Sequence, residues 1–132
     1  MISPTYTGAK FTKENRLTRS SQLYFVLKHG KRINCKWFNI NILQRLPEDE
    51  GVRQRRSVAH CRLGVIIGKK IFKEAVDRNT FKRVAREFFR SHQRRFKKPY
   101  DIVISVYKKP RSKDKAFFLK EIKSGFKAGK LI

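Results

Sequence analysis

Apolar residues recur along the chain with two different periods. Spacings of three and four residues, as at Leu23, Val26 and Leu27, predict helices. We expect helices over residues 17–30, 74–92 and 116–127. Alternation, as at Phe38 and Ile40, or a short apolar run predicts strands. We expect strands over residues 33–46, 61–67 and 101–107.

The residues between these segments support the same division of the chain. Ser20 or Ser21 is expected to cap the first helix, and Gly30 is expected to end it. The order helix, strand, strand, helix, strand, helix indicates one α+β domain over residues 1–132. Its first part, residues 1–16, is expected to be a basic and partly flexible arm.

The helix expected at residues 74–92 has one apolar face and one cationic face. Its apolar positions follow the i, i+3, i+4, i+7 pattern and are Phe81, Val84, Ala85 and Phe88, flanked by Phe89. Its cationic positions are spaced by four and are Arg78, Lys82, Arg86 and Arg90, with Arg83 beside them. A merely solvated face usually alternates charge at this spacing, because each ion pair gains ~0.2–0.5 kcal/mol. Like charges cost a similar amount, so the pattern favours a partner that carries phosphates.

The charge of the whole chain points to the same kind of partner. The 132 residues include 34 Lys and Arg against 10 Asp and Glu, which gives a formal net charge of +24. Repulsion at that charge favours a polyanionic partner, and nucleic acid is the leading candidate. A membrane is not expected, because no apolar run approaches the ~20 residues of a spanning helix. The N-terminus also lacks the apolar core of a signal peptide, so we expect a cytoplasmic protein.

The sequence offers little for catalysis or metal binding by the protein itself. The two cysteines, Cys35 and Cys61, lie far apart, and reduced thiols are the expected state. The acidic cluster at residues 48–50 lies in a predicted loop, and the three histidines are far apart in sequence. We therefore expect no catalytic residue and no metal site in the protein.

The segment KKIFKEAVDRNTFKRVAREFF, residues 69–89, resembles the signature basic helix of the protein subunit of bacterial ribonuclease P. The positions that fit the signature are Lys69, Lys70, Ala75, Val76, Arg78, Asn79, Lys82, Arg83, Arg86 and Glu87. At one signature position where the family usually has arginine, this chain has Thr80. Residues 11–33, 62–70 and 100–109 resemble the family's arm and first helix, the strand before the basic helix, and the last strand. The resemblance therefore runs in order along nearly the whole chain.

The resemblance implies a single-domain α/β sandwich of the α+β class. Helices would pack on a central, mostly antiparallel four-stranded sheet, in the order α-β-β-β-α-β-α. The family forms a ribonucleoprotein that removes the 5′ leader of precursor tRNA, and its RNA subunit hydrolyses the phosphodiester with bound magnesium. The protein is thus expected to be a non-catalytic, monomeric subunit of the holoenzyme. Magnesium would be held mainly by the RNA subunit, with no cofactor bound tightly by the protein.

The resemblance also implies two RNA-binding surfaces. The surface for the ribonuclease P RNA would comprise Lys69, Lys70, Arg78, Asn79, Lys82, Arg83, Arg86 and Arg90. The surface for the precursor tRNA leader, between the first helix and the sheet, would comprise Arg16, Leu23, Tyr24, Leu27, Trp37, Asn39 and Asn41. Trp37 has the polar parity of its expected strand, which is compatible with contact to the ligand and with partial burial. Phe38 is expected in the core.

Two other classes of protein share the charge of this chain. A ribosomal or general RNA-binding protein, without a role in tRNA cleavage, would show the same salt-dependent binding. Preference for precursor over mature tRNA distinguishes it from a ribonuclease P subunit. A basic DNA-binding module ranks lower, because the sequence has no obvious helix-turn-helix pair.

Overall fold

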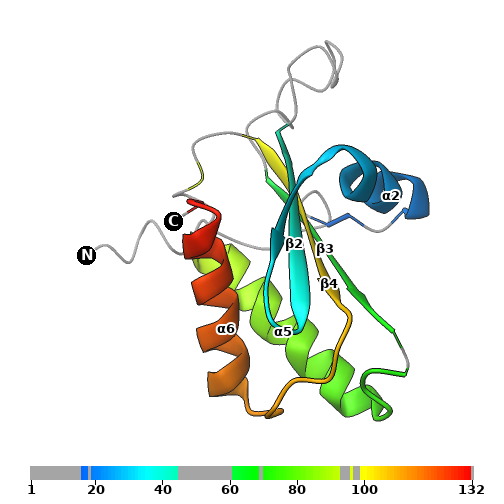
Figure 1. The fold of residues 1–132 in the computed structure, drawn as a ribbon, viewed down its shortest axis with the longest axis vertical. Coiled ribbons are helices and arrows are strands. Elements are labelled where there is room, and N and C mark those ends of the chain that lie inside the picture. The colour runs from blue at the N-terminus through cyan, green and yellow to red at the C-terminus, as the bar shows by residue number, and fades with distance from the viewer. Residues whose placement is uncertain are drawn as a thin grey trace.

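The computed structural model describes residues 16–17, 19–44, 61–68, 70–92, 96 and 99–131. Its elements follow in the order helix, three strands, helix, strand, helix (Figure 1), which confirms the order that the family resemblance implies. The elements are α2 (Ser20–His29), β1 (Lys31–Asn34), β2 (Phe38–Gln44), β3 (Arg62–Ile67), α5 (Ala75–His92), β4 (Tyr100–Val106) and α6 (Lys115–Ala128). Apart from residue 16, the predicted arm lies outside the described residues, as does the acidic cluster.

The four strands form one sheet in the order β1-β2-β4-β3. β1 pairs antiparallel with β2, and β2 pairs antiparallel with β4. β3 and β4 run parallel, and the chain between them passes through α5. Parallel neighbours need such a crossover, because a tight turn cannot join them. The sheet is therefore mixed, with antiparallel pairing predominating as predicted.

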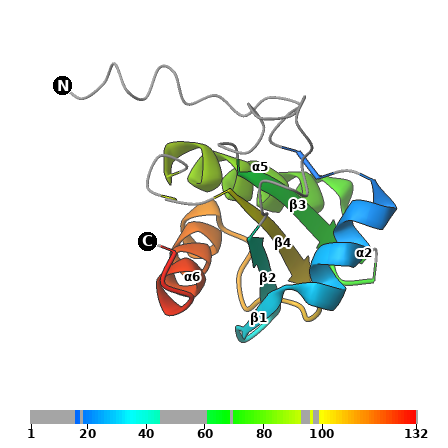
Figure 2. The same cartoon turned by 90° about the horizontal axis from the view of Figure 1, so that it is seen from above.

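Helices cover both faces of this sheet (Figure 2). α5 and α6 lie side by side on one face, and α2 lies on the other. The alternation of β2 explains the division, because Phe38 and Ile40 join the large core under α5 and α6. Asn39 and Asn41, at the intervening positions, therefore face the α2 side. The large core is mainly aromatic, and its fully buried rings include Phe38, Phe72, Phe81, Phe89, Phe118 and Phe126.

A smaller apolar cluster holds α2 on its face of the sheet. Val26 is 1% exposed and packs with Leu17 and Val103. Gly30 ends the helix as predicted and donates its N–H to the Val26 carbonyl oxygen at 2.8 Å. A Cβ at this position would come within 2.6 Å of the same oxygen, so a larger residue would displace the chain. The predicted serine cap is wrong, because Arg19 is the N-cap and has no side-chain capping hydrogen bond.

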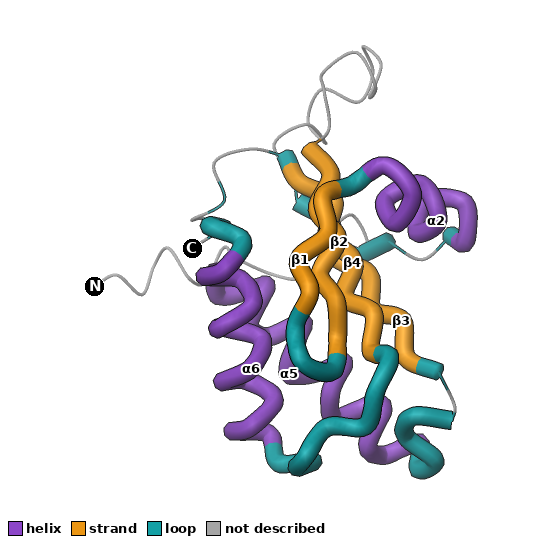
Figure 3. Tube along the Cα trace, in the orientation of Figure 1, coloured by secondary structure: helices purple, strands orange, loops and turns teal. Residues whose placement is uncertain are grey.

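Residues 33–46, expected as one strand, belong to a hairpin (Figure 3). β1 and β2 are joined by a turn at residues 35–37, where the Cys35 N–H donates to the Phe38 carbonyl oxygen at 2.9 Å. The Tyr107 hydroxyl also donates to the Cys35 carbonyl oxygen at 2.6 Å. The prediction of one strand is wrong because this turn contains neither proline nor glycine, the residues that usually mark a break.

The predicted bounds hold to within one residue for β3, α5, β4 and α6, whereas α2 begins at Ser20, three residues after the predicted start at residue 17. α5 and α6 are joined through their rings, with Phe81 and Phe118 at a centroid separation of 5.2 Å and Phe88 and Phe126 at 4.9 Å. These contacts fix the rotation of α5, which determines which of its side chains face outward. Within the described ranges, no helix is both long enough and apolar enough to cross a membrane.

Candidate nucleic-acid interface

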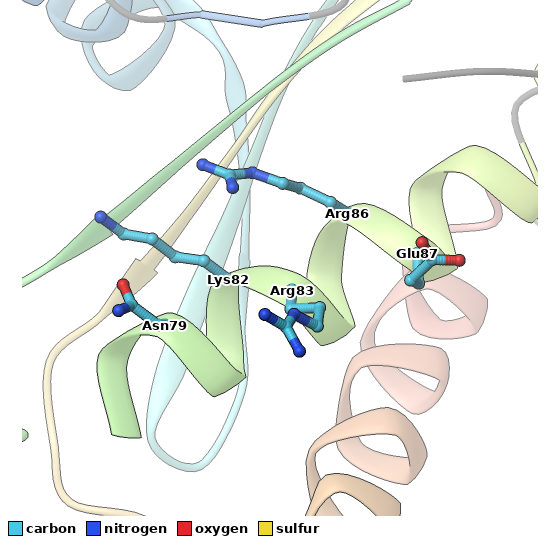
Figure 4. Close-up of a pocket in the computed structure, with 5 residues that line it drawn as sticks. All are labelled: Asn79, Lys82, Arg83, Arg86 and Glu87. Atoms are coloured by element: carbon cyan, nitrogen blue, oxygen red, sulfur yellow. The ribbon is translucent and has the colours of Figure 1, made fainter. Parts of the chain in front are cut away.

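The outward face of α5 carries cationic side chains that line a pocket at the surface. A pocket of about 320 Å³ is lined by Asn79, Lys82, Arg83, Arg86 and Glu87. Figure 4 shows Lys82 and Arg86 extending from α5 in the same direction, while Arg83 bends away from them. The apolar face of the same helix is buried as predicted, so these side chains are held at the surface.

Two of the predicted cations bind neighbouring groups of the protein. Arg78 donates from Nη1 to the Phe72 carbonyl oxygen at 2.6 Å and to that of Lys73 at 3.4 Å. Arg90 forms an ion pair with Glu87 at 2.9 Å. A step of four residues rotates the helix by about 40° beyond a full turn. Arg78 and Arg90 are three such steps apart, so they leave the helix in directions that differ by about 120°. Of the four cations spaced by four, Arg78 and Arg90 are therefore engaged within the protein at the two ends of the face.

The N-terminal end of α5 presents fewer cations than its signature suggests. Thr80 stands at the usual arginine position, and its hydroxyl donates to the Val76 carbonyl oxygen at 2.8 Å. This hydroxyl is thus satisfied within its own helix. Lys70 is exposed in the turn before α5, and Lys69 lies outside the described residues. In the described part of this end, Lys70 and Asn79 are the exposed positions from the predicted RNA-binding set.

A second pocket, of about 190 Å³, lies between the chain that precedes α2, strand β3 and helix α5. Its cationic lining residues are Arg16, Lys82 and Arg86. Backbone pairing fixes residue 16 there, because Arg16 bridges in parallel with Leu63 and the Leu17 N–H donates to the Leu63 carbonyl oxygen at 2.9 Å. Lys82 and Arg86 line both pockets, so the two hollows share their central cations.

Arg16 and Arg86 approach closely enough to interact across the smaller pocket. Partial burial lowers the pKa of Arg86, and the positive charge of Arg16 lowers it further. Arginine remains protonated at physiological pH, so the two guanidinium groups repel each other there. A phosphate bound at this pocket would relieve that repulsion and would accept charge-assisted hydrogen bonds from both groups.

The predicted leader-binding residues differ in accessibility. Arg16 and Tyr24 are exposed, while Leu23, Leu27 and Asn39 are half-buried. Both leucines pack against the apolar cluster that holds α2. Part of each leucine side chain is therefore buried in this cluster, and the rest is accessible to solvent.

A set of buried polar atoms lies on the α2 side of the sheet. Both side-chain polar atoms of Asn41, Oδ1 of Asn39 and Oγ of Ser105 have no hydrogen-bond partner among the described residues. Asn39 and Ser105 stand directly opposite each other in the pairing of β2 with β4. Asn41, one of the predicted leader-binding residues, is buried in this structure, with 1% of its surface exposed. Ser105 was missed, although its alternation with Ile104 could have assigned it to this face.

Trp37 lies on the opposite side of the sheet from α2. The side chain is 4% exposed and stacks on Phe117 with ring centroids 6.1 Å apart. Its Nε1 donates to Oε1 of Glu121, on α6, at 3.2 Å. The predicted place of Trp37 in the leader surface is therefore wrong. Trp37 occupies the hairpin turn, where the alternation of a strand does not apply, so its parity misled the prediction.

Thiols and carboxylates contribute little to this surface. Burial raises the pKa of Cys35, and the charge of Glu121 raises it further, which lowers the thiolate fraction at neutral pH. Cys35 and Cys61 are not joined in a disulfide. Within the described ranges, no group of three His, Cys, Asp or Glu side chains is arranged to hold a metal ion.

The fold and the paired cationic pockets define an α+β domain with a surface suited to RNA. The sequence model of the family described as Ribonuclease P matches residues 11–129. A ribonuclease P protein component of Vesicomyosocius okutanii subsp. Calyptogena okutanii is 30% identical over 101 residues, 76% of this chain and 80% of that protein. One from Desulfatibacillum aliphaticivorans is 37% identical over 98 residues, 74% of this chain and 73% of that protein.

Two solved structures share this fold. The RNase P protein of Staphylococcus aureus superposes with a TM-score of 0.72 at 21% identity, covering 89% of this chain and 96% of that one. The RNase P protein of Thermotoga maritima gives a TM-score of 0.61 at 24% identity, covering 83% and 92%. The chain belongs to the ribonuclease P protein family. This membership assigns it to the ribonuclease P holoenzyme and to tRNA processing.

Proposed function

We propose that the chain binds the RNA subunit of ribonuclease P through the α5 face and holds the 5′ leader of precursor tRNA on the α2 side of the sheet. The RNA subunit performs the phosphodiester hydrolysis. The observation that carries this proposal is that Lys82 and Arg86 line two pockets at once. These two side chains join the outer face of α5 to the pocket beside residue 16, so one cationic surface can serve two RNA strands.

The α5 face has the chemistry and the rigidity of an RNA-binding surface. Arg83 and Arg86 carry planar guanidinium groups that can bind phosphate oxygens in pairs, while Lys82 acts as a more flexible point charge. Asn79 adds an amide that donates and accepts hydrogen bonds. Because the aromatic core fixes the rotation of α5, little ordering is needed on binding.

The α2 side of the sheet has properties that suit an unpaired strand. Leu23 and Leu27 offer apolar surface, and Asn39 offers an amide at its edge. Burying unpaired polar atoms costs free energy, so the amide of Asn41 would gain from a ligand that pairs with it. The apolar cluster that holds α2 on the sheet is smaller than the core on the other face. Contacts of this kind discriminate weakly between bases, as a subunit that serves many leaders requires.

We assign magnesium and the hydrolysis itself to the RNA subunit. Mg²⁺ prefers oxygen ligands, including phosphate oxygens, which RNA supplies in abundance. The protein carries a formal net charge of +24 and so repels a free cation. Its part in the reaction is to hold the RNA subunit and the leader in register, as one copy in the cytoplasmic holoenzyme.

Reconstitution with the RNA subunit from the same genome tests this function. The protein alone should leave precursor tRNA intact, and the RNA with the protein should remove the leader at a magnesium concentration at which the RNA alone is slow. The assembled particle should also bind precursor tRNA more tightly than mature tRNA. A general RNA-binding protein would give no acceleration and no preference for the precursor, and that result would contradict the proposal.

A further inference from the structure

Two aromatic side chains project from the outer face of α2. Tyr24 is 64% exposed and Phe25 is 54% exposed. The inner face of the same helix buries Val26 and half-buries Leu23 and Leu27, so it already supplies the contact with the sheet. The outer rings are therefore not needed to hold α2 in place. Exposed rings of this size, adjacent on one helix, usually mark a binding surface.

Neighbouring side chains hold both rings in defined positions. The rings of Phe25 and His29 lie one helical turn apart, with centroids separated by 4.5 Å and planes inclined by 44°. The ammonium of Lys28 lies 5.9 Å from the centroid of the Tyr24 ring. The two pairs form a small platform of aromatic and cationic groups on the outer face of α2.

The charge around this platform indicates which partner it fits. Residues 19–44 contain no aspartate or glutamate. The exposed cations of this segment are Arg19, Lys28, Lys31, Arg32 and Lys36. A second copy of the chain would bring another +24 of charge and would be repelled. Aromatic rings among cations, in a segment without acidic residues, are the combination that binds unpaired nucleic acid, because bases stack while the cations neutralise phosphates.

We propose that the outer face of α2 is a stacking platform for unpaired RNA bases, in which Phe25 and Tyr24 each take one base. The inference rests on the proposed function, which brings the single-stranded leader to this helix. It extends the leader's path beyond the surface between α2 and the sheet, and onto the solvent side of the helix. Stacking of this kind accepts any base, so the platform would add affinity without sequence preference.

The test compares two labelled oligoribonucleotides of equal length by fluorescence anisotropy with the full chain. One carries adenine bases, and the other is abasic with the same number of phosphates. Phe25→Ala should weaken binding of the adenine strand about fivefold or more and change binding of the abasic strand by less than about twofold. Phe25→Tyr should retain the affinity of the parent chain. Leu119→Ala, which truncates another exposed apolar side chain on α6, is the matched control and should bind both strands normally.

Four results would overturn the proposal. Equal losses for both strands would show that the surface acts through phosphates alone. Full affinity in Phe25→Leu would show an apolar contact without stacking. A parent chain that is dimeric in sedimentation, with Phe25→Ala monomeric, would show a protein interface. Leader removal by the reconstituted holoenzyme is scored separately. Normal cleavage by the holoenzyme, together with unchanged RNA binding by Phe25→Ala, therefore rejects the platform alone. No cleavage by the holoenzyme reconstituted with the parent protein rejects the proposed function.

Discussion

The guanidinium of Arg78 lies against the main chain of Phe72, with Nη1 donating to the carbonyl oxygen at 2.6 Å. The ring of Phe72 is fully buried, so this hydrogen bond ties the first turn of α5 to the core through the turn that precedes it. A cation of the signature motif therefore supports the beginning of the helix. Its effect on RNA binding must be separated from its effect on folding.

Arg78→Ala should lower the free energy of unfolding by about 1–2 kcal/mol, because the helix start loses a charge-assisted hydrogen bond. Arg83→Ala is the matched control, since it removes the same charge from an exposed position on the same helix. That variant should stay within about 0.5 kcal/mol of the parent protein. Urea denaturation, monitored by circular dichroism, measures the free energy of unfolding of both variants. Equal stability of the two variants would argue against a structural role for Arg78.

Trp37 is the one tryptophan of the chain, so its fluorescence reports the turn between β1 and β2 directly. Emission from the folded protein should be blue-shifted and poorly quenched by acrylamide, because the ring is 4% exposed. Trp37→Ala should cost about 3–5 kcal/mol of stability, and Trp37→Phe should cost less, since it keeps a packed ring. A leader oligonucleotide should leave the emission nearly unchanged. Strong quenching by that oligonucleotide would place Trp37 at the RNA surface after all.

Gly64 allows the chain before α2 to lie against β3. A Cβ at this position would overlap the Leu23 side chain and come within 3.0 Å of the Leu17 carbonyl oxygen. Gly64→Ala should therefore destabilise the protein by about 1–3 kcal/mol through overpacking. It should also weaken leader binding, because Arg16 would move. Gly68→Ala is the control, since its Cβ would meet Ile71 only at an ordinary 3.8 Å. Thermal unfolding of both variants measures the difference, and equal melting temperatures would contradict this account.

The strongly periodic parts of the chain were predictable from sequence. α5 is the clearest case, because its buried face at Phe81, Ala85 and Phe88 follows directly from helical spacing. The positions of Lys82 and Arg86 on the other face follow from the same spacing, whereas the pocket beside residue 16 depends on its pairing with β3. The order of the strands and helices came from the resemblance to a family, since periodicity alone does not define which strands pair.

Tertiary contacts decided the features that sequence could not predict. The Arg78 side chain has a backbone acceptor within reach, which a helical wheel does not show. Trp37 packs against α6 because its Nε1 donates to Glu121 and its ring stacks on Phe117. Asn41 has the alternation of a surface residue but is covered on the α2 side of the sheet. In each case the deciding partner is distant in sequence or outside the local pattern.

Asn41→Leu tests whether the buried amide is kept for a ligand. The substitution removes two buried polar atoms that lack partners among the described residues, so stability should stay level or rise by about 1 kcal/mol. Affinity of the holoenzyme for precursor tRNA should fall, while affinity of the protein for the RNA subunit should not. Filter binding with both RNAs measures the two effects. Unchanged precursor affinity in a stable variant would show that Asn41 does not contact the leader.

The salt dependence of binding to the ribonuclease P RNA tests the central claim most directly. The measurement compares a Lys82→Ala, Arg86→Ala double variant with a Lys120→Ala, Lys127→Ala variant, which removes the same charge from exposed positions on α6. The α5 variant should bind more weakly, and its slope of log affinity against log salt should be shallower by about 1–2, because two phosphate contacts are lost. The α6 variant should keep the parent slope. Equal slopes for the two variants would show that net charge, and not the face of α5, determines binding of the RNA subunit.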